Sequence, residues 1–179
     1  MKFQSIAALA APFALLFSGS AFAQDASEED KHFQGVYGGI TAGYGDFSSG
    51  GDGANVDFFL GGRLQSDNGL VYGIEGVLGI SDSESREPFL DLFDGYNSVI
   101  GKIGYTPDNR VMWYGGVGYT SVDVVNELVN LDRADGVVFE AGVEYMPSSW
   151  FGLRLRGQYH TASNEADITN VGAGLFFSF

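Results

Sequence analysis

The chain has 179 residues, with 9 Lys and Arg against 23 Asp and Glu and a formal net charge of -14. This acidity argues against a nucleic-acid partner, because phosphates attract basic side chains. It does not indicate disorder, since 45% of the residues are hydrophobic and 15% are aromatic. The chain contains no cysteine, so neither disulfides nor thiolate chemistry can contribute.

The N-terminus has the pattern of a secretory signal peptide. Lys2 precedes an apolar stretch, and Ala21-Phe22-Ala23 fits a small-residue cleavage site. The alternative is a membrane anchor or a buried first helix, but the apolar stretch is shorter than the ~20 residues that a spanning helix needs. We therefore predict a cleaved signal peptide at residues 1–23, an acidic N-terminal segment at 24–33 and a folded domain at 34–179.

The rest of the chain alternates between apolar and polar residues with a period of two, which indicates β-strands. Eight such stretches occur at residues 34–45, 55–65, 70–80, 96–106, 111–122, 137–146, 150–161 and 168–179. Short turns at 66–69, 107–110 and 147–149 alternate with longer polar links at 46–54, 81–95, 123–136 and 162–167. This order predicts an all-β fold, an eight-stranded antiparallel up-and-down transmembrane β-barrel.

The two faces of the predicted strands differ in chemistry. One face is apolar and carries no charged residue, whereas the other carries four acidic and four basic side chains: Asp57, Arg63, Glu75, Lys102, Glu140, Glu144, Arg154 and Arg156. Lipid outside and a polar interior explain this division, because Arg or Lys facing the bilayer centre costs ~2–4 kcal/mol. A soluble, lipocalin-like barrel is the alternative. We interpret the eight charges as a paired network that fills the lumen.

Aromatic residues on the apolar face predict two membrane-interface girdles. One lies beside the short turns and comprises Tyr72, Tyr105, Trp113, Tyr145 and Phe151, followed by Phe177 and Phe179 of the last strand. The other lies near the longer links and comprises Tyr44, Tyr119 and Tyr159. This placement and the export signal favour the membrane barrel over the soluble one.

Three segments carry a family resemblance: "GYNSVIGKIGYTPDNRVMWYGGVGYTSVDV", "FEAGVEYMPSSWFGLRLRGQYH" and the terminal "VGAGLFFSF". They resemble the small porin-like outer-membrane barrels of alphaproteobacteria, the opacity-like and OmpA-like eight-stranded type, and the resemblance covers residues 33–179. It implies a place in the cell outer membrane, after export through the periplasm. We also predict that the protein is a monomer in contact with outer-membrane lipid and lipopolysaccharide. It also implies that Leu175, Phe177 and Phe179 are the signal read by the barrel-assembly machinery.

The remaining question is activity. Lipid A deacylases of the membrane-barrel type use a His and a Ser two residues apart and facing the lipid, but His160 and Ser163 are three apart and would face opposite sides. We predict no enzyme activity, no cofactor and no metal site, and a structural or surface-interaction role in the envelope. A narrow, low-conductance porin for small solutes is the first alternative, and a lipid A-modifying enzyme is the second.

Overall fold

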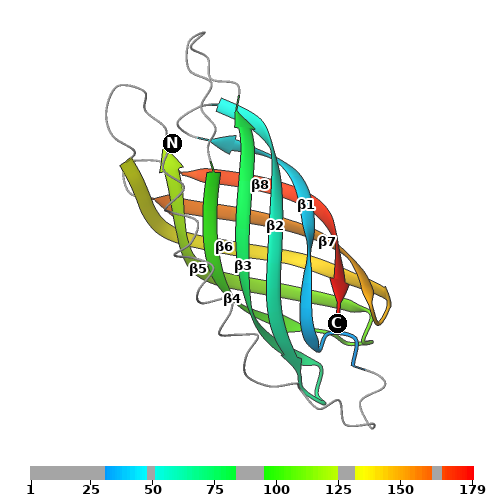
Figure 1. The fold of residues 1–179 in the computed structure, drawn as a ribbon. Coiled ribbons are helices and arrows are strands. Elements are labelled where there is room, and N and C mark those ends of the chain that lie inside the picture. The colour runs from blue at the N-terminus through cyan, green and yellow to red at the C-terminus, as the bar shows by residue number, and fades with distance from the viewer. Residues whose placement is uncertain (1–30, 48–50, 84–94, 125–131, 163–166) are drawn as a thin grey trace.

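A computed structural model describes residues 31–47, 51–83, 95–124, 132–162 and 167–179. They form one closed barrel in which each strand pairs with its neighbours in sequence and the last strand pairs with the first (Figure 1). The strands are β1 (Gly35–Phe47), β2 (Gly51–Gln65), β3 (Leu70–Ser83), β4 (Gly95–Tyr105), β5 (Val111–Val124), β6 (Asp132–Ser148), β7 (Phe151–Ala162) and β8 (Ile168–Ser178). The predicted fold class is confirmed. No helix among the described residues is long and apolar enough to cross a membrane.

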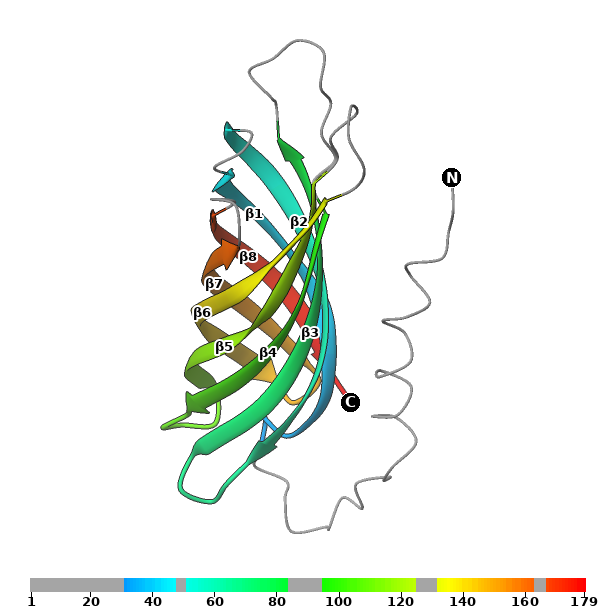
Figure 2. The same cartoon turned by 90° about the vertical axis from the view of Figure 1, so that its left-hand side faces the viewer.

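Both ends of the barrel sheet, the start of β1 and the end of β8, lie at the end that carries the turns β2–β3, β4–β5 and β6–β7 (Figures 1 and 2). We call this the short-turn end and the opposite end the loop end. In the β2–β3 turn, Gly69 has a positive φ of 82°, and a Cβ there would lie 2.4 Å from the Thr106 carbonyl oxygen. Only glycine fits this position, which explains where the chain reverses.

The side chain of Asp108 stabilises the β4–β5 turn. Asp108 Oδ1 accepts hydrogen bonds from the backbone N–H groups of Arg110 (3.1 Å) and Val111 (3.0 Å). These two bonds hold the pKa of the Asp108 carboxyl below its usual range, and the bond from Val111 has the larger effect. Asn109 takes a left-handed φ of 59°, a conformation that asparagine tolerates better than most residues.

The strands are longer than expected, and the predicted link at residues 46–54 is wrong. β1 and β2 stay paired as far as Phe47↔Gly51, so only residues 48–50 lie between them. Likewise, β5 and β6 remain paired to Val124↔Asp132. Polar and glycine-rich residues made these stretches look like loops, but a backbone ladder already in register continues through residues of low strand propensity.

Smaller corrections concern the strand ends. β6 runs on through a register shift between Tyr145 and Ser148, so the β6–β7 turn is Ser149 and Trp150 rather than residues 147–149. Such an irregularity accommodates Pro147, which has no N–H for the ladder. Gln34, Thr106 and Phe179, predicted as strand residues, lie just outside the strands.

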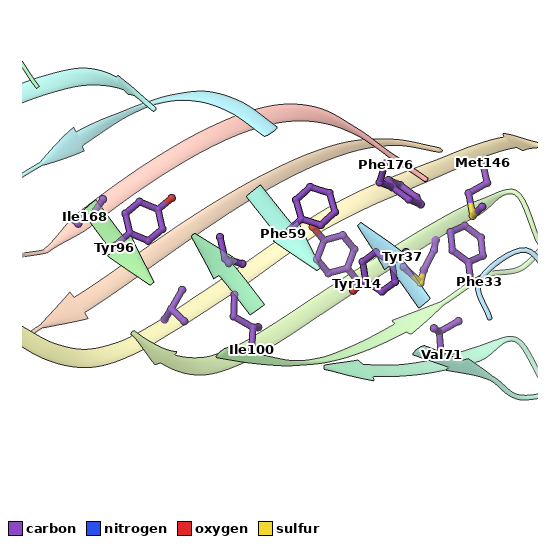
Figure 3. Packing of buried hydrophobic residues seen from close by; sticks show 13 residues of the cluster. Phe33, Tyr37, Phe59, Val71, Tyr96, Ile100, Tyr114, Met146, Ile168 and Phe176 are labelled. Atoms are coloured by element: carbon purple, nitrogen blue, oxygen red, sulfur yellow. The ribbon is translucent and has the colours of Figure 1, made fainter. Parts of the chain in front are cut away.

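The outer surface of the barrel is apolar and the inside is mixed. Outward side chains such as Phe58, Leu78, Val117 and Leu155 are exposed, as expected for a face in contact with lipid. Buried apolar residues form one cluster that runs along the inside of the barrel (Figure 3). Tyr96 and Ile168 lie toward its loop end, whereas Phe33, Val71, Met146 and Phe176 lie toward its short-turn end.

Candidate functional site: the charged lumen

All eight of the charged residues predicted to face inward lie inside the barrel. They come from β2, β3, β4, β6 and β7, where alternation turns every second side chain toward the axis. Their side chains are almost completely buried, the most accessible being Lys102 at 7%. Such groups are rarely buried unless they are paired, so their mutual contacts decide what the lumen is.

Arg154 is the centre of the short-turn half of this set. Its guanidinium donates to Glu75 (Nη1–Oε1 3.0 Å, Nη2–Oε2 2.8 Å) and to Glu144 (Nε–Oε1 2.9 Å, Nη2–Oε1 2.6 Å). Glu144 is also paired with Arg63, at 2.5 Å between Oε2 and Nη1. Bidentate geometry of this kind is what a guanidinium offers and an ammonium does not.

The loop-end half continues the same pattern. Lys102 Nζ lies 2.9 Å from Glu75 Oε2 and 2.7 Å from Glu140 Oε1. Arg156 then joins Glu140 (3.6 Å, Nη1–Oε2) to Asp57. The eight groups therefore form one linear chain of alternating sign, in the order Arg63, Glu144, Arg154, Glu75, Lys102, Glu140, Arg156 and Asp57.

Neutral side chains complete the hydrogen bonding of the carboxylates. The Tyr37 hydroxyl donates to Glu75 Oε2 (2.8 Å) and the Tyr96 hydroxyl donates to Asp57 Oδ1 (2.5 Å). Gln158 Nε2 donates to Glu140 Oε2 (2.6 Å) in the same way. A carboxylate with several donors is far better compensated for lost hydration than one with a single ionic partner.

Aromatic faces cover the cations. The Arg154 guanidinium carbon lies 3.9 Å from the centre of the Phe59 ring, Arg63 lies 4.4 Å from the centre of Tyr37, and the Lys102 ammonium lies 4.4 Å from the centre of Tyr114. These distances are within the range of cation–π attraction. Three of the four cations, Arg63, Lys102 and Arg154, are thus enclosed by carboxylates on some sides and by ring faces on others.

Glycines provide the space for these long side chains. A Cβ on Gly73, which is the β3 partner of Arg63, would lie 3.1 Å from Arg63 Cβ. Lys102 lies opposite Gly116 on β5 and Gly73 on β3. An eight-stranded barrel is just wide enough for side chains to fill, so a guanidinium or ammonium needs neighbours without side chains.

A small cavity lies inside the described part of the barrel. A cavity in the short-turn half, lined by residues that include Tyr37, Arg63, Lys102, Met112 and Tyr114, measures about 10 Å³. A volume of that size holds at most one water molecule. The arrangement is therefore suited to holding the barrel wall together, and a solute would have to displace the ion pairs to pass.

The aromatic residues predicted to form girdles point outward. Tyr44, Tyr72, Tyr105, Trp113, Tyr119, Tyr145 and Tyr159 are exposed, and Phe151 is half-buried. The Tyr159 hydroxyl donates to Asp167 Oδ2 at 3.0 Å near the loop end. At the short-turn end, Trp150 stacks on Phe177, with ring centres 5.9 Å apart and planes at 14°. Trp150 was not among the predicted girdle residues, although it is 60% exposed beside them.

The last strand has the expected alternation. Leu175, Phe177 and Phe179 face outward, and Phe179 is 82% exposed. Ser178 and Phe176 face inward, and the Phe179 N–H donates to the Val36 carbonyl oxygen (2.8 Å), which fixes the end of the chain to β1. Recognition of these residues by an assembly machinery stays a prediction.

His160 lies inside the barrel rather than on the lipid face. It is completely buried, its ring lies 4.7 Å from the ring of Tyr96, and its Nδ1 lies 3.1 Å from Thr120 Oγ1. Ser163, the serine compared with it in the sequence, lies outside the described residues. The described part of the chain also holds no group of three or more His, Cys, Asp or Glu placed to bind a metal ion.

Sequence reasoning missed the inward aromatic residues that support the charges. Tyr37, Phe59, Tyr96, Tyr114 and Phe176 are all buried, yet only the outward rings were assigned a role. The signal was available, because each of them lies an even number of residues from an inward-facing charged or polar residue of the same strand and therefore faces the same side. Phe33 had no such signal, since it precedes the first strand and was assigned to the acidic N-terminal segment.

Comparison with known proteins agrees with this architecture. Residues 9–179 match the family described as "Outer membrane protein beta-barrel domain". No curated protein matches the chain.

Several solved structures share the fold at low sequence identity. Ail, the attachment invasion locus protein of Yersinia pestis, is 15% identical, with a TM-score of 0.56 over 82% of this chain and 99% of that chain. The N-terminal β-barrel domain of Pseudomonas aeruginosa OprF is 13% identical, with a TM-score of 0.58 over 82% and 98%. Neisserial surface protein A is 14% identical, with a TM-score of 0.53 over 80% and 96%.

Proposed function

Because the chain belongs to the outer membrane protein β-barrel family, we propose that it is a plugged barrel of the outer membrane with a structural or surface-interaction role in the cell envelope. The observation that carries this proposal is the linear chain of eight buried charges, which crosses the lumen from Arg63 to Asp57. Its charges sum to zero and its members contact one another rather than water. A plug needs such a network, whereas a conducting path needs a continuous column of water.

The proposed role includes no enzyme activity. His160 is the only catalytic candidate that the sequence offered, and its burial beside Tyr96 and Thr120 supports a packing role in the lumen. A lipid A-modifying enzyme would need its nucleophile and base on the outer face. That face carries apolar side chains over the middle of the strands among the described residues.

Any surface interaction belongs to the loop end, where exposed acidic residues lie. Asp46 and Asp52 face each other across β1 and β2 and are exposed, as is Asp135 of β6. Ail has been solved in complex with the heparin analogue sucrose octasulfate. An acidic rim would repel such a polyanion, so we propose basic ligands, or divalent cations shared with lipopolysaccharide phosphates, as the partners of this rim.

The remaining parts of the proposal follow from the family and from the sequence. We propose that residues 1–23 direct export through the periplasm and are removed, and that the barrel-assembly machinery reads Leu175, Phe177 and Phe179. The mature barrel is a monomer in contact with outer-membrane lipid and lipopolysaccharide. Its place among the small porin-like barrels of alphaproteobacteria rests on the resemblance of its sequence segments.

Planar-bilayer recording tests the plug. The mature chain, residues 24–179, is refolded into lipid, and a change of gel mobility on boiling verifies that it is folded. We expect no reproducible conductance steps from the folded protein. Steady steps would overturn the plug and identify a narrow porin whose interior charges are its filter.

The charge-reversing variant Arg154→Glu separates the two functions further. In a plug, it places three carboxylates together and should prevent stable folding or lower stability strongly. In a porin, it would shift the ion selectivity of a barrel that remains folded. Tyr72→Phe, which keeps the outward ring of the girdle, is the matched control and should change neither property.

A further inference from the structure

The segment that precedes β1 crosses the short-turn end of the barrel. The Phe33 backbone N–H donates to Gln65 Oε1 at the end of β2 (3.0 Å), and Gln65 Nε2 in turn donates to Asn109 Oδ1 in the β4–β5 turn (2.5 Å). Lys31 Nζ lies 2.8 Å from Asp67 Oδ1 in the β2–β3 turn. The segment is therefore attached to the end of β2 and to the β2–β3 turn, and Gln65 connects it to the β4–β5 turn.

The Phe33 ring occupies the opening itself. Phe33 is completely buried although it belongs to no strand, and it lies near Tyr37, Met146 and Phe176 toward the short-turn end of the core (Figure 3). The Arg63 guanidinium carbon lies 4.9 Å from the centre of its ring. The ring therefore covers the guanidinium that begins the charge chain.

The ion pair behind the Phe33 ring is sensitive to water. Arg63 is paired with Glu144 at 2.5 Å, and both side chains are at most 2% exposed. Arg63 and Tyr37 also line the 10 Å³ cavity, together with Met112 and Tyr114. Water entering here would screen the outermost ion pair, because the attraction between two charges falls as the local dielectric constant rises.

We propose that residues 31–34 form a strap that closes the short-turn mouth of the barrel, with Phe33 as the stopper and Gln65 as the latch that holds it. The charge chain blocks the middle of the lumen, and the strap separately keeps periplasmic water out of its short-turn half. Because the strap lies outside the strands, it is able to open while the sheet stays intact. This inference goes beyond the proposed plug, since either could hold without the other.

Thiol labelling tests the strap, because the natural chain has no cysteine. Met112→Cys places the only thiol at a buried position that lines the cavity in the short-turn half. Ser98→Cys places it at a buried position paired with Thr120 in the loop-end half. The labelling rate of each folded protein by a small water-soluble thiol reagent is measured with Phe33 intact and with Phe33→Ala.

The strap predicts that Phe33→Ala speeds labelling at position 112 by about tenfold or more, as expected for a site that has become open to solvent, and leaves position 98 unchanged. Gln65→Leu, which keeps the ring but removes the latch acceptor, should act in the same direction to a smaller extent. Trp150→Ala, an exposed aromatic residue at the same end, should have no effect.

Two results would overturn the strap. Unchanged labelling at position 112 in both Phe33→Ala and Gln65→Leu would mean that the segment does not seal the mouth. Equal acceleration at positions 112 and 98 would mean that Phe33 stabilises the whole barrel as an ordinary core residue. Gln65→Leu keeps the test decisive if Phe33→Ala does not fold.

Discussion

Replacing Arg154 with methionine tests whether charges hold the lumen together. The Arg154 side chain is fully buried and donates to Glu75 and Glu144 through four hydrogen bonds. Methionine fills part of the space but leaves the lumen with four carboxylates and three cations. Neither carboxylate loses every partner, because Lys102 stays 2.9 Å from Glu75 and Arg63 stays 2.5 Å from Glu144.

The expected loss follows from these contacts. Removing one partner of a buried ion pair typically costs about 3–5 kcal/mol, and a hydrogen bond to a charged group contributes about 1.5–3 kcal/mol. Since each carboxylate keeps one cation, we expect Arg154→Met to lose ~3 kcal/mol of unfolding free energy, at the low end of that range. Adding Glu75→Gln removes one carboxylate and so restores neutrality, with three carboxylates and three cations. Lys102 is not left unpaired, because it still contacts Glu140. The double variant should therefore be more stable than Arg154→Met alone.

Urea unfolding in lipid vesicles measures both differences. The chain has two tryptophans, Trp113 and Trp150, and both are exposed on the outside, so their fluorescence reports the loss of lipid contact. Linear extrapolation of the unfolding free energy to zero urea gives the comparison with the natural protein. A loss below ~1 kcal/mol for Arg154→Met, or a double variant no more stable than the single one, would refute the view that the network carries the stability of the lumen.

Three further predictions use the same unfolding assay or a titration. Tyr37→Phe removes a buried hydroxyl that donates to a carboxylate at 2.8 Å and should lower the unfolding free energy by ~1.5–3 kcal/mol. Tyr114→Phe is the control, because its buried hydroxyl has no hydrogen-bond partner among the described residues, and it should not change the unfolding free energy. The Asp108 carboxyl has a lowered pKa, so by NMR it should titrate below the ordinary Asp value of about 3.9. The stability that this carboxylate contributes is present above that value and is lost as the pH falls through the folded-state pKa. Leu155→Arg, in the middle of the outer face, should cost ~2–4 kcal/mol, whereas Tyr119→Arg near the loop end should cost about 0–1 kcal/mol.

The alternation of the sequence was enough to place the charges inside but not to pair them. Period two assigns a face to each residue of a strand, so Glu140 and Glu144 share a face wherever the strand lies. Pairing depends on how far each strand is staggered around the barrel. Arg63 and Glu144, which pair at 2.5 Å, are 81 residues apart, and no local pattern reports the stagger that brings them together.

The strap could not be predicted from periodicity for a different reason. Phe33 belongs to no strand, so it has no parity to assign, and its acidic neighbours made the segment look solvated. Its burial depends on a tertiary pocket built from β1, β6 and β8, to which Tyr37, Met146 and Phe176 belong. Long-range packing of this kind overrides the local composition of the segment.

The unusual combination of many glycines with many aromatic residues has one explanation in the lumen. Phe176 is completely buried, and its direct partners on the flanking strands are Gly39 of β1 and Gly152 of β7. A Cβ on Gly39 would lie 2.7 Å from Phe176 Cβ, and one on Gly152 would lie 2.2 Å from the Phe176 ring. In a narrow barrel, a ring that fills the axis excludes side chains beside it, and Lys102, whose Cγ would lie 3.3 Å from a Cβ on Gly116, does the same on β5. The glycines are therefore as much a part of the proposed plug as the charges, because a side chain at these positions would collide with the Phe176 ring or crowd Lys102.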